Sequence, residues 1–160
     1  MPALSIDHAA FPCFDVAATH RFYTETLGCP LVFALSAPSE AWKVEEFLLL
    51  TYGLPDGSAI DFFSFDGIAR PDDGLPKDIR HIGLAVPKRE NVLAFKERFE
   101  RASISCWVET HGADDLHVYG IDPNGLVIEI LAAEDGSRAR AKDTEGALKT
   151  LERWFARHHG

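Results

Sequence analysis

Two stretches of the sequence decide the fold: IDHAAFPCFDVAATHRFYTETLG, which begins at Ile6, and IRHIGLAVPKRENVLAFKERFER, which begins at Ile79. Each reads Ile-x-His, then a short apolar alternation, a turn and an amphipathic helix. In each stretch a Phe follows the His by 14 positions, and His8 and His81 are 73 positions apart. A repeat of this size indicates two copies of one supersecondary unit that share a core.

The chain after each repeat continues in the same way in both halves. One helix is expected over Val16–Leu27, capped by Asp15 and ended by Gly28, and the other over Glu90–Arg101. Strand-like segments follow each helix, at 29–35, 45–53 and 58–65 in the first half and at 103–109, 115–121 and 126–131 in the second. The sequence therefore predicts an α+β fold of two tandem βαβββ modules.

The module boundaries follow from the linkers. Module one spans 4–66 and module two spans 79–133, with a Pro-, Gly- and Asp-rich linker between them, and both belong to a single domain over 1–133. Residues 134–160 are expected to form a polar linker and a C-terminal amphipathic helix.

Composition excludes several classes of function. A net charge of −9 over 160 residues argues against nucleic acid or an anionic membrane surface as a partner. The three cysteines include no CxxC pair, so neither a disulfide framework nor a thiolate zinc site is indicated. Because the sequence has no signal peptide and no apolar run of membrane-spanning length, a cytoplasmic location is expected.

Four polar side chains interrupt apolar strands, two per repeat. Glu129 lies within LVIEIL, and burying its carboxylate ionised and unpaired would cost on the order of several kcal/mol. Asp61 has the same place in AIDFFSF, and His8 and His81 open the first strand of each copy. Two imidazoles with one carboxylate suit Fe(II), whereas a set that adds Asp61 suits Zn, Ni, Co or Mn as a Lewis acid.

The chain resembles the vicinal oxygen chelate superfamily (glyoxalase, bleomycin resistance and extradiol dioxygenase proteins) over about Leu4 to Ala133. The likeness is carried by the element FYTETLG, the segment IRHIGLAV and the closing hairpin YGIDPNGLVIEIL. It implies a curved mixed sheet around a central metal cleft. The metal ligands that it implies are His8, His81 and Glu129, with Asp61 at the position of a fourth ligand.

The closing hairpin is also similar to the signature of type I extradiol dioxygenases. In that signature a His is followed by an aliphatic-Tyr pair, then by D-P-x-G and a Glu ligand. Here these positions are His111, Val118-Tyr119, Asp122-Pro123-x-Gly125 and Glu129, while Glu109 departs from the pattern.

The expected function is therefore a metal-dependent, ring-cleaving dioxygenase for a small aromatic or vicinal-oxygen substrate. Fe(II) is the expected metal, with Zn, Ni and Mn as alternatives. Tyr119 would hydrogen-bond a substrate oxygen, and His111 or His117 would steer protons. Phe47 and Phe63 could line an aromatic pocket.

Two other functions remain open on the sequence alone. A glyoxalase I-like lyase or isomerase would use Asp61 or Glu129 to shuttle a proton beside a Lewis-acid metal. A resistance-type relative would bind a small molecule without metal. Whichever function applies, the resemblance implies a homodimer, and no nucleic-acid or membrane partner is expected.

Overall fold

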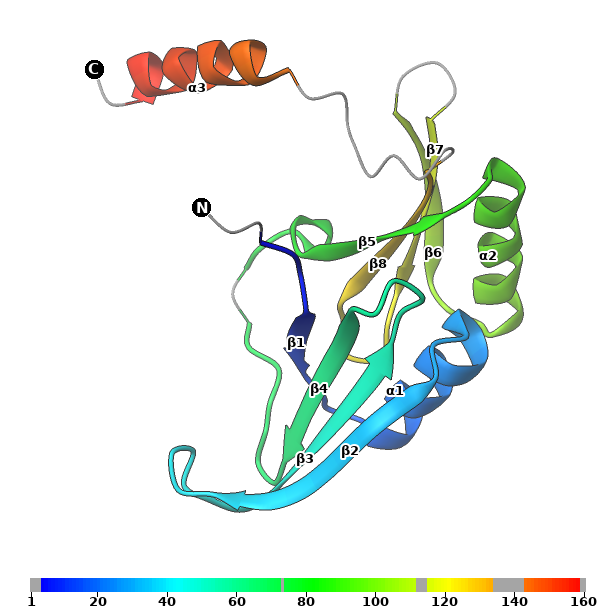
Figure 1. Ribbon diagram of the computed structural model, residues 1–160, viewed down its shortest axis with the longest axis vertical. Coiled ribbons are helices and arrows are strands. Elements are labelled where there is room, and N and C mark those ends of the chain that lie inside the picture. Colours follow the sequence, from blue (N-terminus) through cyan, green and yellow to red (C-terminus); the bar gives the residue numbers. More distant parts are fainter. Residues whose placement is uncertain (1–3, 73, 112–114, 134–142, 159–160) are drawn as a thin grey trace.

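The computed structural model describes residues 4–72, 74–111, 115–133 and 143–158 (Figure 1). Module one contains β1 (His8–Pro12), α1 (Val16–Arg21), the π-helical η1 (Phe22–Leu27), β2 (Leu31–Ser39), β3 (Val44–Gly53) and β4 (Ala59–Phe65). Module two contains β5 (His81–Val86), α2 (Arg89–Arg101), β6 (Cys106–His111), β7 (Asp115–Ile121) and β8 (Val127–Ala132). The 3₁₀ turn η2 (Lys77–Ile79) precedes β5, and α3 (Thr144–His158) closes the chain.

The two modules have the same sheet topology. The strand orders are β1-β4-β3-β2 and β5-β8-β7-β6, and in each sheet the first and last strands of the module pair in parallel. The registers also agree, because Ala10 is the partner of Asp61 in one sheet and Gly83 is the partner of Glu129 in the other. The predicted α+β fold with two repeated modules is confirmed.

The first helix begins where the sequence predicts but is not one regular α-helix. Asp15 caps it by accepting a hydrogen bond from the Ala18 amide at 2.8 Å, which satisfies one of the free N–H groups of the first turn. From Phe22 onward the chain widens into a π-helix, and Gly28 ends it at φ 80°, a conformation that suits glycine. Apolar periodicity does not distinguish the two helical forms, so the π-helical part was not predicted.

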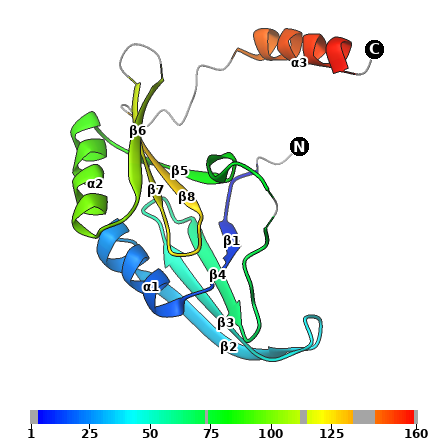
Figure 2. The same cartoon turned by 180° about the vertical axis from the view of Figure 1, so that it is seen from behind.

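Helices α1 and η1 cover one face of the first sheet, and α2 covers one face of the second (Figure 2). Contacts between η1 and α2 also join the modules. In each sheet one set of alternating strand residues is buried on that side, such as Ile60 and Phe62 in β4 and Ile128 and Ile130 in β8. The rings of Phe22 in η1 and Phe99 in α2 stack at 6.1 Å between centroids. The core of the molecule therefore lies on the helical side, and the residues that alternate with it face away.

A second contact between the modules is the turn before β8. The Asn124 side chain accepts a hydrogen bond from the Phe14 amide at 2.9 Å and donates to Thr19 Oγ1 at 3.0 Å. Tyr23 donates its hydroxyl to Asp122 Oδ2 at 3.3 Å. The turn of module two is thus bonded to the β1–α1 segment of module one.

The C-terminal helix stands apart from both sheets (Figure 1). Its large apolar side chains are all about half exposed: Leu148, Leu151, Trp154 and Phe155. The polar linker predicted before it falls largely on 134–142, which lies outside the described residues. None of the helices in the described ranges has the length and apolar character that crossing a membrane takes.

Candidate metal centre on the helix-free sheet faces

The helix-free face of each sheet, the side opposite α1 and η1 or α2, carries the polar side chains that sequence analysis singled out. Strand alternation places Glu129 on this face, because its neighbours Ile128 and Ile130 fill the core on the other side. The register then adds Tyr119, opposite Glu129, and His117, opposite Leu131. His111 follows on the edge strand β6.

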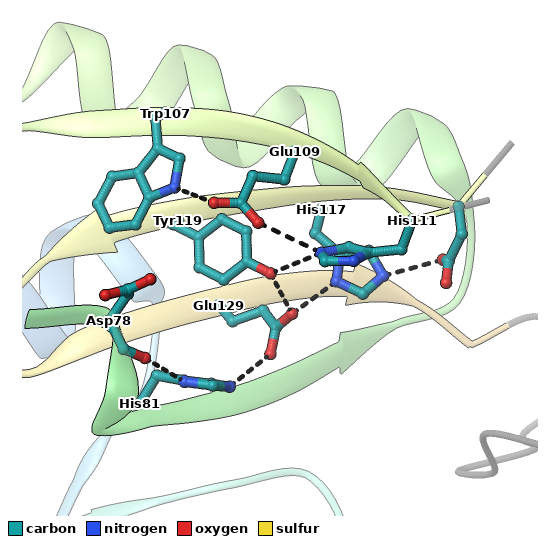
Figure 3. A network of polar contacts seen from close by, with 9 residues as sticks. Asp78, His81, Trp107, Glu109, His111, His117, Tyr119 and Glu129 are labelled. Atoms are coloured by element: carbon teal, nitrogen blue, oxygen red, sulfur yellow. Dashed lines mark hydrogen bonds and ion pairs between the residues drawn. The ribbon is translucent and has the colours of Figure 1, made fainter. Parts of the chain in front are cut away.

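Glu129 is the centre of a hydrogen-bond network (Figure 3). Glu129 is only 5% exposed. Its Oε1 accepts hydrogen bonds from His117 Nδ1 at 2.5 Å and from the Tyr119 hydroxyl at 2.7 Å. Because the Tyr119 proton goes to Glu129, the contact of 3.1 Å between His111 Nε2 and Tyr119 Oη has His111 as donor. The protons are therefore aligned from His111 through Tyr119 to Glu129.

The charge of Glu129 follows from these contacts. Burial raises the pKa of the carboxyl group, but the hydrogen bonds from Tyr119 and His117 and the neighbouring imidazoles outweigh burial and lower that pKa below its ordinary value. The buried carboxylate is thus ionised at neutral pH, which answers the difficulty posed by an acid among aliphatic residues.

Trp107 and Glu109 support the outer side of this network. The Trp107 ring stacks on Tyr119 with centroids 5.1 Å apart and planes 10° from parallel. Its indole N–H donates to Glu109 Oε1 at 2.8 Å, and Glu109 Oε2 lies 3.4 Å from His111 Nε2. Glu109, a departure from the dioxygenase signature, therefore has a local role in holding Trp107 and His111.

His81 is oriented toward the other oxygen of Glu129. Its Nδ1 lies 2.7 Å from the Asp78 carbonyl oxygen, which can only accept, so Nδ1 carries the proton. The other ring nitrogen, Nε2, lies 3.2 Å from Glu129 Oε2. Two ligand atoms on one ion, each at about 2.1 Å, lie about 3.0–3.5 Å apart, so this pair has the spacing of neighbouring metal ligands.

Module one repeats this arrangement with His8 and Asp61. His8 Nδ1 contacts Asp7 Oδ1 at 2.8 Å, and its Nε2 lies 3.9 Å from Asp61 Oδ2. The hydrogen bond with Asp7, followed by the charge of Asp61, raises the pKa of His8 above 6.5. Asp61 is 8% exposed, and its Oδ1 has no hydrogen-bond partner.

The two modules differ by one carbon in the acid and by one carbon in the small residue paired with it. A Cβ added to Gly83 would lie 3.2 Å from Glu129 Oε2 and 3.3 Å from Leu131 Cδ2, so the absent side chain makes room for the carboxylate. In module one the equivalent position is Ala10, which has a Cβ, and its partner Asp61 is shorter by one methylene. The longer acid is thus paired with the residue that has no side chain, and the shorter acid is paired with alanine.

The structure does not bring all the predicted ligands together. Within the described ranges, the group of three or more possible ligands whose donor atoms lie within 4.8 Å of one another is His111, His117 and Glu129. Among the predicted ligands, Glu129 is the one that His81 contacts, and His8, with a side chain 52% exposed, is on the other sheet with Asp61. A site shared by both modules therefore requires the two helix-free faces to be opposed.

The donor atoms that are present fit a divalent ion. In each module an imidazole is fixed at Nδ1 by an oxygen acceptor and presents Nε2 toward a carboxylate, which is how metal-binding histidines are commonly held. The buried oxygen of Asp61 without a hydrogen-bond partner is a further candidate ligand atom. The Asp78 carbonyl was not predicted, since a backbone contact leaves no signal in residue types.

The predicted aromatic residues lie together on the helix-free face of module one. Phe63 is two positions from Asp61 on β4, and its ring is 5.9 Å from that of Phe47 on β3. Trp42, in the turn between β2 and β3, lies 5.1 Å from Phe47 and 5.3 Å from Phe63. The place of Trp42 in this aromatic cluster was not predicted, because the β2–β3 hairpin brings it there.

Solved structures with the same fold have several functions in their names. A glyoxylase/bleomycin resistance protein/dioxygenase domain from Frankia sp. EAN1pec has a TM-score of 0.66 at 17% identity, with 84% of this chain and 96% of that chain covered. Lactoylglutathione lyase from Agrobacterium tumefaciens has a TM-score of 0.61 at 18% identity, with coverage of 86% and 99%. A putative dioxygenase from Bacillus subtilis has a TM-score of 0.63 at 23% identity, with coverage of 82% and 41%.

The family itself is shown by sequence. A search of curated proteins finds no match. Residues 5–130 match the family model described as Glyoxalase/Bleomycin resistance protein/Dioxygenase superfamily, a span that includes both modules and both histidine–acid pairs. The chain belongs to the glyoxalase/bleomycin resistance protein/dioxygenase superfamily.

Proposed function

We propose that the protein is a metal-dependent enzyme that cleaves the ring of a small aromatic diol, as an extradiol-type dioxygenase. The observation that carries this proposal is the aligned series His111–Tyr119–Glu129 beside His81. It places a hydroxyl donor next to a carboxylate whose second oxygen lies beside an imidazole nitrogen. The Bacillus subtilis relative, named a putative dioxygenase, has the same fold.

The proposed ligands are His8, His81 and Glu129. Their donor set, two imidazoles and one carboxylate, leaves coordination positions open, and Fe(II) is the proposed ion, with Zn, Ni or Mn as alternatives. When bound, Fe(II) supplies the redox chemistry of ring cleavage, whereas Zn or Ni supplies Lewis acidity. The chain's own contribution is to fix each imidazole by Nδ1 and to keep Glu129 ionised.

Tyr119 and His111 would handle the substrate's protons. Tyr119 donates to Glu129 and accepts from His111, so a substrate oxygen near this hydroxyl can exchange a proton with it, and His111 can replace that proton. His111 has access to solvent, since its side chain is 48% exposed. Phe47 and Phe63 would contact the apolar part of an aromatic substrate.

A second candidate function is supported by the pair His8 and Asp61. If Asp61 also binds the ion, the ligand set becomes two imidazoles and two carboxylates, and Asp61 or Glu129 would shuttle a proton in a glyoxalase I-like reaction without redox chemistry. The unpartnered Asp61 Oδ1 favours this reading. The lactoylglutathione lyase of similar fold supports it as well.

We also propose that the enzyme is a cytoplasmic homodimer that acts on a small molecule. The support is the uncovered face of module one, where Phe33 and Leu35 on β2 are 52% and 42% exposed. Both belong to the face that carries Asp61 and Phe63, according to the registers of β2 with β3 and of β3 with β4. A second copy would cover these side chains and would bring two helix-free faces into opposition.

Metal analysis tests the shared part of both proposals. The protein purified without oxygen should contain about one divalent ion per chain, and Glu129→Ala should lose it, whereas Glu97→Ala on the exposed side of α2 should keep it. A wild-type chain that retains and binds no ion would overturn both enzyme proposals in favour of a metal-free binding protein.

Substrate assays separate the two enzyme classes. Oxygen uptake with catechols by the iron-loaded protein, lost in Tyr119→Phe, is expected for ring cleavage. Isomerisation of a thiol–aldehyde adduct by the nickel- or zinc-loaded protein, lost in Asp61→Ala and absent with catechols, would instead establish the glyoxalase-like function.

A further inference from the structure

We propose that His117 is a positioning residue that fixes which oxygen of Glu129 is offered to the metal. The inference rests on the proposed metal-dependent function but assigns His117 a different role from the proton transfer that the sequence suggested. Together with Tyr119, His117 occupies Oε1, so that Oε2 alone remains for an ion shared with His81.

The first support is the geometry at Oε1. His117 Nδ1 and the Tyr119 hydroxyl approach this one oxygen from two neighbouring positions of β7, at 2.5 and 2.7 Å. A carboxylate oxygen that accepts two charge-assisted hydrogen bonds has little capacity left for a cation. The carboxylate cannot rotate to exchange its oxygens without breaking both contacts.

The second support is the way His117 itself is held. It is 5% exposed, and its Nε2 lies 2.9 Å from Asp115 Oδ1, an ion-pair contact whose angle is not that of a hydrogen bond. A carboxylate therefore lies on each side of the imidazole ring. These contacts of the buried ring support a positioning role.

The third support is the contrast with Oε2. Its neighbours are His81 Nε2 at 3.2 Å and the space beside Gly83, where a Cβ would lie 3.2 Å away. One oxygen of Glu129 therefore accepts two hydrogen bonds, whereas the other lies beside His81 (Figure 3).

The competing arrangement makes His117 a ligand. Because donor atoms of His111, His117 and Glu129 lie within 4.8 Å of one another, an ion could be held within module two alone. With Nδ1 as the ligand atom, His117 would give up its proton and its bond to Glu129, and with either ring nitrogen the arrangement would not use His8. The two arrangements therefore differ in their response to substitutions at His117 and His8.

The test is a titration of Co²⁺ into the metal-free full-length protein, with the visible spectrum of the ion as readout of its coordination. His117→Asn keeps an N–H donor near the place of Nδ1, and His117→Leu has almost the same shape without a donor. We expect His117→Leu to lower the Co²⁺ affinity about 10–100-fold and to alter the spectrum, whereas His117→Asn stays within about three-fold of wild type.

Tyr119→Phe removes the other donor to Oε1 independently, and we expect it to weaken binding in the same direction. This variant keeps the test decisive if His117→Leu does not fold, which far-UV circular dichroism would reveal. A Co²⁺ affinity unchanged in Tyr119→Phe and in folded His117→Leu would overturn the positioning role while leaving the proposed function intact.

Two other outcomes also contradict the inference. Loss of binding in both His117 variants with no effect of His8→Ala would show that His117 is a ligand in a site of module two. A wild-type protein without affinity for Co²⁺ would overturn the proposed function, and the inference with it.

Discussion

The residue that pairs with each buried acid differs in size between the two modules. Module one combines Ala10 with Asp61, and module two combines Gly83 with Glu129. The alternation of strand residues was enough to predict that small residues next to the histidines leave room on that face. It could not predict that the Gly and the longer acid are matched, because that depends on the parallel register of β5 and β8.

Gly83→Ala should weaken metal binding. The new Cβ would lie 3.2 Å from Glu129 Oε2, so the carboxylate must move away from His81. We expect about a ten-fold loss of Zn²⁺ affinity in a competition titration with a chelator. Adding Glu129→Asp should recover part of this loss, because the double variant reproduces the Ala10–Asp61 pair of module one. An unchanged affinity in Gly83→Ala would disprove the spatial argument.

The contacts of His117 show what residue types alone do not predict. Its place on the same face as Tyr119 follows from alternation, but both were expected to face substrate. In the structure His117 contacts Asp115 on its own strand and Glu129 on β8, and the contact with Glu129 depends on the antiparallel register of β7 with β8. Pairing registers are set by contacts distant in sequence, so residue types alone could not reveal this contact.

At the scale of elements, most of the strands and helices could be predicted because the repeat supplies each signal twice. The helix predicted at Glu90–Arg101 is observed at Arg89–Arg101, and the strand predicted at 115–121 has those bounds. The π-helical η1 was missed, since it differs from an α-helix in backbone hydrogen bonding rather than in apolar spacing.

The turn over residues 122–125 should make stability depend on pH through Asp122. Burial is the main cause that raises the pKa of this carboxyl above 3.8, against the hydrogen bonds that it accepts. The pKa of Asp122 is therefore higher in the folded than in the unfolded protein. Its protonated form stabilises the folded protein below the unfolded pKa, and this contribution is lost as pH rises through the folded pKa.

Asp122→Asn should remove this pH dependence. Urea unfolding of both proteins between about pH 4 and 7 should show the free energy of unfolding of wild type falling relative to the variant as pH rises. Parallel curves for the two proteins would contradict the assignment. At neutral pH we also expect the variant to lose about 1–3 kcal/mol, because its amide cannot accept at both of the positions that Asp122 uses.

Helix α3 should be dispensable for the fold. Its large apolar side chains are about half exposed, so removing it uncovers no core. A chain that ends at residue 143 should keep its melting temperature within about 2 °C and its Zn²⁺ affinity, which would also support the proposed domain boundary at residue 133. A fall of more than about 5 °C would show that α3 packs against the domain in solution.

At the scale of the whole molecule, the ligands that sequence analysis grouped together are divided between two sheets. The repeat correctly indicated that each module contributes a histidine and an acid at equivalent positions. The angle between the modules, however, is decided by contacts such as Phe22 with Phe99, and no local pattern encodes it. The equivalent positions of the two pairs could therefore be predicted from the repeat, whereas the distance between the pairs depends on packing that residue types do not encode.

The proposed homodimer predicts a mass of twice 17.7 kDa in sedimentation velocity. Phe33→Glu should shift the protein toward the monomer, because it places a charge on the apolar face of β2 that a second copy would bury. Leu93→Glu, at a 42% exposed position of α2, is the matched control and should remain dimeric. A wild-type protein that sediments as a monomer would rule out the dimer.

The turn that bonds Asn124 to Phe14 and Thr19 also begins the strand that carries Glu129. It therefore links the start of β8 to the β1–α1 segment of module one. If a substrate drew the two modules together, these hydrogen bonds would be strained at the start of β8. The amide of Leu126, which donates to Asp122 at 2.7 Å, would register such closure as a change in its hydrogen-exchange rate.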